Sequence, residues 1–138
     1  MDTRLSGTVT ALRIAIGLMA TLAGLDKFFN LLTKWEAYVA PAAQPLLPFS
    51  TTTFMAVVGV IEFVVGVTIL AIRPSLGAFV ASAWLVLMAM NLVLGGHFDI
   101  AVRDLVLAVA AYALARFEQV RETTPVAAPI GQRRTVTA

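Results

Sequence analysis

The sequence predicts an all-α fold, an integral membrane four-helix bundle formed by a single domain. Two observations lead to this prediction. Hydrophobic residues make up 59% of the 138 residues, charged residues make up only 13%, and the mean hydropathy is +0.89. This chain is far more apolar than an ordinary globular domain. In addition, four segments are each long enough, at about 1.5 Å per residue, to cross roughly 30 Å of hydrocarbon.

We expect the four transmembrane spans near residues 9–32, 54–72, 76–96 and 99–117. The first is longer than the apolar core of a signal peptide, and it carries Asp26 and Lys27 where a cleavage site would lie. We therefore interpret it as a retained helix. Three prolines exclude a continuous helix into the second span, and Trp35 and Tyr38 are amphipathic aromatics typical of the headgroup level. The 33–53 segment is predicted to be an interfacial loop with a short surface helix.

Turn signals separate the remaining spans. Arg73-Pro74-Ser75 is predicted to connect the second span to the third, and Gly95-Gly96-His97 the third to the fourth. Apolar periodicity is lost after Arg121. The transmembrane domain is therefore expected to cover residues 1–121, and residues 122–138 are expected to form a disordered cytoplasmic tail.

The distribution of basic residues predicts the orientation. With an even number of spans, both termini lie on one side, together with most of the basic residues: Arg4, Arg13, Arg73, Arg116, Arg121, Arg133 and Arg134. The other side carries only Lys27, Lys34 and Arg103. The positive-inside rule then places both termini in the cytoplasm, which predicts a multi-pass protein of the cell inner (plasma) membrane whose main partner is the lipid bilayer.

Composition also excludes several classes of function. The net charge is only +2 and the basic residues are scattered, so the pI near 9.5 does not indicate nucleic-acid binding. The chain contains no cysteine, which excludes disulfides, thiolate metal sites and thiol redox relays.

Polar and ionisable residues gather in one layer of the predicted bundle. Such residues are costly within a bilayer, at roughly 2.5 to 3.5 kcal/mol for a charge near its centre, so a cluster indicates mutual pairing, a water-filled cavity or a functional site. The predicted topology places the whole set in the outer half of the membrane: Asp26, Lys27, Glu62, Asn91, His97, Asp99, Arg103 and Asp104.

Helical spacing predicts where two of these acids point. Asp104 begins a stripe of small residues, Ala108, Ala111 and Ala115, that allows another helix to approach closely, so Asp104 should face the bundle interior. Glu62 lies on a similar stripe between two glycines.

Arg103 is expected to join several acids. Asp99 and Arg103 form an i, i+4 pair with the acid N-terminal, which is the favourable order on a helix. Arg103 is therefore predicted to bridge Asp99 within its own helix and either Glu62 or Asp26 across the bundle.

Within the polar layer, Glu62 and Asp104 are the candidates for handling protons. The candidate substrate-binding residues are Asp26, Lys27, Asn91, His97, Asp99 and Arg103. No metal site is expected, because His97 has no second His or Cys in helical register. A structural ion-pair network that fixes the helix register is an equally open interpretation of the same residues.

Over residues 8–120 the chain resembles the DoxX-like family of small four-helix bacterial membrane proteins. The resemblance rests on three motifs: Arg13-x3-Gly17 followed by Ala23-Gly24-Leu25-Asp26-Lys27-Phe28, Gly59-x2-Glu62-x3-Gly66, and His97-Phe98-Asp99-x3-Arg103-Asp104-Leu105. It implies a four-helix membrane fold and an association with quinones or membrane redox complexes.

Three functions remain open from the sequence, and with them whether the protein is an enzyme. The first is a quinone-associated redox subunit, in which a bound quinone or a partner subunit carries the electrons because the chain has no cysteine. The second is a non-enzymatic scaffold or assembly subunit, including a homo-oligomer. The third is a small proton-coupled transporter that uses a membrane-embedded carboxylate such as Glu62.

Overall fold

A computed structural model describes residues 3–124, and all the regular secondary structure in this range is helical. The long helices are α1 (Thr3–Asp26), α2 (Thr51–Val67), α3 (Pro74–Leu94) and α4 (Phe98–Thr123). A π-helical segment, η3 (Thr68–Ile72), extends α2. Two short 3-10 helices lie between α1 and α2, namely η1 (Trp35–Tyr38) and η2 (Gln44–Leu46). The prediction of an all-α chain with four long helices is confirmed for this range.

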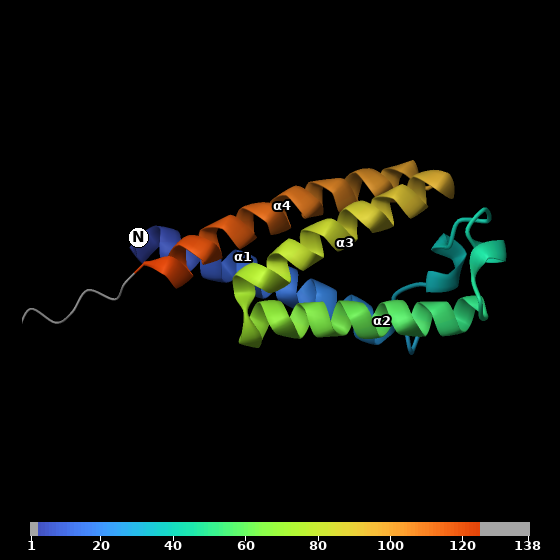
Figure 1. Ribbon diagram of the computed structural model, residues 1–138, viewed down its shortest axis with the longest axis horizontal. Helices are drawn as coiled ribbons and strands as arrows, with labels where there is room; N and C mark the ends of the chain where they lie inside the picture. The colour runs from blue at the N-terminus through green and yellow to red at the C-terminus, as the bar shows by residue number, and fades with distance from the viewer. Residues whose placement is uncertain (1–2, 125–138) are drawn as a thin grey trace, which may run out of the picture.

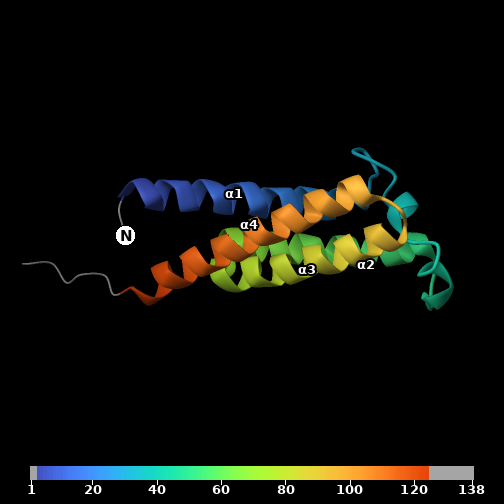
Figure 2. The ribbon, with the colours of Figure 1, turned by 90° about the horizontal axis from the view of Figure 1, so that it is seen from above.

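The four long helices form two antiparallel pairs (Figures 1 and 2). α1 packs mainly on α2, and α3 packs mainly on α4. The pairs lie close together near η3 and diverge toward the end that carries η1 (Figure 1). An apolar core that includes Ile69 and Leu114, each 0% exposed, fills the closed end. The divergent end is where the polar residues lie.

Glycines bring α1 and α2 into direct backbone contact. A Cβ atom added to Gly24 would lie 2.6 Å from the carbonyl oxygen of Gly59 and 2.5 Å from the backbone nitrogen of Phe63. A Cβ on Gly66 would lie 2.5 Å from the backbone nitrogen of Thr21. Small residues permit this approach between apolar helices. The prediction that Glu62 emerges where backbones pack closely is confirmed.

The predicted first span, 9–32, is wrong at its C-terminal end, because α1 ends at Asp26. The Asp26 carboxylate accepts hydrogen bonds from the backbone N–H groups of Leu31 and Leu32, at 2.9 and 3.0 Å. Asn30 has a φ of 52°, in the left-handed region that asparagine tolerates better than most residues. The chain therefore turns back immediately after Asp26 instead of continuing as a helix.

Within residues 3–124, three helical segments are long and apolar enough to cross a membrane: Arg4–Asp26, Thr51–Ile72 and Pro74–Leu94. Their outward faces expose large apolar side chains such as Leu18, Val60 and Leu87. Water-soluble proteins rarely expose contiguous apolar surfaces of this kind. These features indicate a membrane protein.

The fourth predicted span, 99–117, differs from the others. It lies within α4 but is not among the three strongly apolar segments. The physical reason is its charge, since Asp99, Arg103 and Asp104 begin the segment and Arg116 lies at its end. α4 continues to Thr123, so the predicted tail begins too early at residue 122. The remainder of that tail, 125–138, lies outside the described residues.

Candidate functional site

Two adjoining cavities lie between the helix pairs at the divergent end of the bundle. The cavity beside the α1–α2 segment, here called the loop-side cavity, has a volume of about 350 Å³. The second, here called the deep cavity, has a volume of about 420 Å³ and continues along α1 as far as Ile16. Six residues line both cavities: Lys27, Leu32, Trp35, Glu62, Arg103 and Asp104. Four of them are charged residues of the predicted polar layer.

An ion pair between Lys27, in the turn directly after α1, and Glu62 of α2 forms one wall. Lys27 Nζ lies 2.5 Å from Glu62 Oε2, and the two side chains are only 4% and 15% exposed. Trp84 on α3 donates from Nε1 to Glu62 Oε1 at 3.3 Å. Lys27 Nζ also lies 3.7 Å from the ring centroid of Trp35, at cation–π distance. The close approach at Gly24 and Gly59 explains why these two long side chains meet.

A second ion pair lies across the cavity on α4. Arg103 donates from Nε and from one terminal nitrogen to Asp104 Oδ1, at 3.2 and 3.1 Å. Asp104 is buried as predicted, together with its small-residue stripe, Ala108, Ala111 and Ala115.

The predicted bridges from Arg103 are wrong. Its side chain is 63% exposed and pairs with Asp104, while Asp99 is exposed in the first turn of α4 without a hydrogen bond or ion pair to Arg103 within residues 3–124. The cavity separates Arg103 from Glu62, and Asp26 is already occupied by the loop.

Asp26 and Asn91 hold the α1–α2 segment in place rather than facing the cavity as free groups. Besides its two backbone partners, Asp26 accepts from Trp35 Nε1 at 2.8 Å. Asn91 on α3 accepts from the Ala40 backbone N–H at 3.1 Å and donates to the Tyr38 carbonyl oxygen at 2.8 Å. Both residues therefore position the aromatic side chains of η1 over the cavity.

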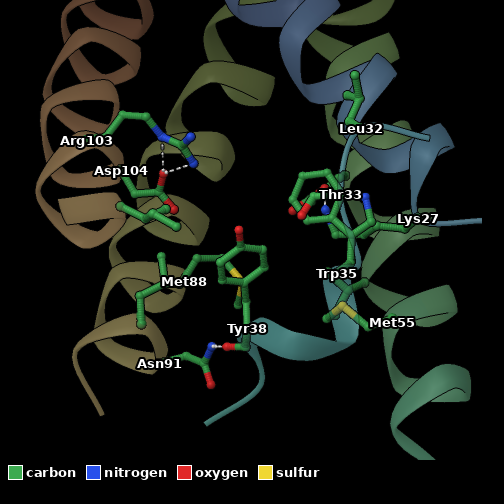
Figure 3. Close-up of a pocket in the computed structure, with 14 residues that line it drawn as sticks. Lys27, Leu32, Thr33, Trp35, Tyr38, Met55, Met88, Asn91, Arg103 and Asp104 are labelled. Atoms are coloured by element: carbon green, nitrogen blue, oxygen red, sulfur yellow. Dashed lines mark hydrogen bonds and ion pairs between the residues drawn. The ribbon is translucent and has the colours of Figure 1, made fainter. Parts of the chain in front are cut away.

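Tyr38 is one of these aromatic residues. Figure 3 shows its hydroxyl pointing into the loop-side cavity toward Arg103 and Asp104. The Tyr38 ring also packs edge-on with the ring of His97, at a centroid distance of 5.1 Å. His97 itself does not line either cavity.

Sequence reasoning missed the aromatic and methionine residues of the site. The cavities are lined additionally by Trp35, Tyr38, Met55, Trp84 and Met88. The tryptophan and tyrosine of the loop were interpreted as belt residues at headgroup level. The two tryptophans could have been predicted to lie near the polar layer, because a partly buried indole N–H needs an acceptor. In the structure both donate to carboxylates of that layer.

A second charged cluster, at the closed end, was also missed. Glu118 is 3% exposed and lies 3.1 Å from Arg121 and 4.0 Å from Arg13. Arg13 also donates to the Leu70 carbonyl oxygen of η3 at 2.6 Å. The polar layer at the divergent end is thus not the only set of buried charges in the described chain.

Within residues 3–124, no group of three His, Cys, Asp or Glu side chains is arranged to hold a metal ion. No model of a known protein family, no curated protein and no solved structure matches the chain. The chemistry of the cavity lining therefore has to carry the functional argument.

Proposed function

We propose that the protein is a four-span protein of the inner (plasma) membrane with both termini in the cytoplasm. The exposed apolar faces of the helices support insertion in a membrane, and the excess of basic residues on the side of the termini supports the orientation. α4 is compatible with a fourth span because its buried acids, Asp104 and Glu118, are 14 residues apart, or about 21 Å along the helix, and each pairs with an arginine. The stretch between them is apolar apart from Arg116 near its end.

The orientation is tested by cysteine labelling, which is simple in a chain without native cysteine. Thr52→Cys, at the exposed start of α2, should react with a membrane-impermeant thiol reagent in intact cells. Thr124→Cys, exposed after the end of α4, should react only after the cells are opened. The reverse pattern would invert the topology, and labelling of both in intact cells would exclude an even number of spans.

We further propose that the cavities bind the head group of a quinone, which makes the protein a quinone-associated redox subunit of the DoxX-like kind. The observation that carries this proposal is the pairing of charges around the cavity. Lys27 with Glu62, and Arg103 with Asp104, leave the lining with no net charge. A neutral ligand suits such a lining, because a charged ligand would bring a charge for which the lining has no free counter-charge.

The polar atoms available to a ligand are mostly donors. The ammonium of Lys27, the guanidinium of Arg103 and the hydroxyl of Tyr38 reach the cavity from three sides, while both carboxylates already accept from cations (Figure 3). A flat neutral molecule with two carbonyl oxygens matches these donors, and the rings of Trp35 and Tyr38 and the side chain of Met88 offer flat or deformable apolar contacts. The two volumes fall in the range of small-molecule sites. Because the chain has no cysteine, none of its thiols can supply electrons, and the proposal assigns their supply to a redox partner subunit.

The quinone proposal is tested by binding. Quinone should appear in the lipid extract of the gently purified protein, and an added menaquinone should quench the fluorescence of Trp35 and Trp84, which are the chain's 2 tryptophans and both line the cavities. Arg103→Gln should weaken binding about tenfold or more, because it removes a charged donor.

The matched control is Arg116→Gln, an exposed arginine on the same helix outside both cavities, which should bind like the wild type. Equal thermal melting of the two variants excludes a folding defect. Absence of quinone from the extract together with no saturable quenching would reject the proposal.

A structural role is the second candidate, and one observation favours it. The ion pair of Lys27 with Glu62 joins the turn after α1 to α2. Asp26 and Asn91 anchor the loop, so most of the predicted binding residues have a partner inside the protein. If the protein is a scaffold or assembly subunit, substitutions at these residues should lower its melting temperature, and the wild-type protein should bind no quinone.

A further inference from the structure

The deep cavity extends well beyond the polar layer. From Lys27 it follows α1 past Ala23 and Ala20 to Ile16, a distance of about 16 Å along the helix. Away from the charged residues its walls are apolar, with Val65 on α2 and Leu85 on α3. Water does not fill such a space, because a buried water needs several polar partners. An apolar chain is therefore its natural occupant.

The deep cavity also opens sideways. α1 and α4 pack mainly on other helices, and the deep cavity lies between them. Its rim on the α1 side includes Leu22, which is 56% exposed, and Leu32, which is 72% exposed. In the proposed membrane orientation this opening faces the acyl chains of the bilayer rather than water.

We propose that the site binds a lipid-soluble ligand whose apolar tail lies in the deep cavity along α1 and leaves through the opening between α1 and α4. This inference rests on the proposed quinone function and specifies the class of ligand. The head group occupies the loop-side cavity, and the tail extends along Ala23 and Ala20. The continuity of the two cavities through the charged residues that line both supports a single ligand spanning them. The ligand reaches the site from within the bilayer.

The inference is tested with two probes that share one head group. Menadione has no tail, whereas a menaquinone carries an isoprenoid tail. Both are titrated against the full-length protein in detergent by tryptophan quenching. Ala20→Leu adds bulk to the wall of the deep cavity, and Ala15→Leu makes the same change at an exposed position of α1 outside it. Ala20→Leu should weaken menaquinone binding about tenfold or more and change menadione binding little. Ala15→Leu should change neither.

The outcomes separate the inference from the function on which it rests. If neither probe binds the wild type, the quinone proposal fails and the tail site fails with it. If menadione binds as tightly as menaquinone, or if Ala20→Leu weakens both probes equally, only the tail site is rejected. A second variant, Leu22→Phe, adds bulk at the lateral opening without adding a tryptophan to the fluorescence signal, and it should also act on menaquinone alone. Its control is Leu18→Phe, one turn away on the exposed surface.

Discussion

Glu62→Met should lower the free energy of unfolding by about 3 to 5 kcal/mol, since it leaves a buried lysine without its counter-charge. The Lys27 side chain is 4% exposed, and among residues 3–124 its ammonium has only the Ala23 carbonyl oxygen, at 3.5 Å, as a further hydrogen-bond acceptor. Trp84 Nε1 also loses its acceptor. The measurement is reversible unfolding of the purified protein in a mild detergent.

The double variant Lys27→Met/Glu62→Met is the internal control. Removing both charges together leaves neither one buried alone, and two methionines of similar length can fill the space, so the double variant should be considerably more stable than Glu62→Met. The contrary result is that the double variant loses as much unfolding free energy as the two single variants lose in sum. That result would show that the two side chains are energetically independent.

Gly24→Ala should also be strongly destabilising. The added methyl would meet the Gly59 carbonyl oxygen at 2.6 Å and the Phe63 nitrogen at 2.5 Å. Both atoms belong to the backbone of α2, so no side chain can rotate away and the two helices must separate. Overpacking of this kind typically costs about 1 to 3 kcal/mol. Separation would also lengthen the contact between Lys27 and Glu62, so we expect an effect at the upper end of that range.

Gly7→Ala provides the comparison for Gly24→Ala. Gly7 is on the same helix, and a Cβ added there meets nothing within 4 Å. Because alanine is the better helix former, Gly7→Ala should be neutral or slightly stabilising. Equal melting temperatures for the two variants would show that the close contact between α1 and α2 is absent in the folded protein.

The features that could be predicted from the sequence depend on residues near one another in the chain. The four helices follow from long apolar segments, the turns at Arg73 and Gly96 from local proline and glycine residues, and the inward direction of Asp104 from spacing along one helix. The structure confirms all three. The glycines beside Glu62 likewise indicated close packing, although the pairing with Lys27 was not predicted.

Contacts between elements distant in the sequence could not be predicted in the same way. The end of α1 depends on hydrogen bonds from a turn that lies beyond it, so the apolar run up to Leu32 was misinterpreted as a longer helix. The partner of Arg103 depends on the width of the cavity, which no periodicity reveals. Similarly, the burial of Glu118 follows from the meeting of α1 and α4 at the closed end.

The pairing of Lys27 with Glu62 has a consequence for how such a chain is built into a bilayer. If α1 entered the lipid alone, the ammonium group of Lys27, directly after the helix, would have no partner, at a cost of up to about 3.5 kcal/mol. Entry of α1 together with α2 avoids this cost because each helix brings the charge that neutralises the other. α4 pairs its own charges, Arg103 with Asp104, and is held to α3 by the hydrogen bond from Ser82 to the Ala108 carbonyl oxygen at 2.8 Å. In the proposed four-span topology, insertion as two successive helical hairpins is therefore favoured, and the cavity between the helix pairs forms only when the second hairpin meets the first.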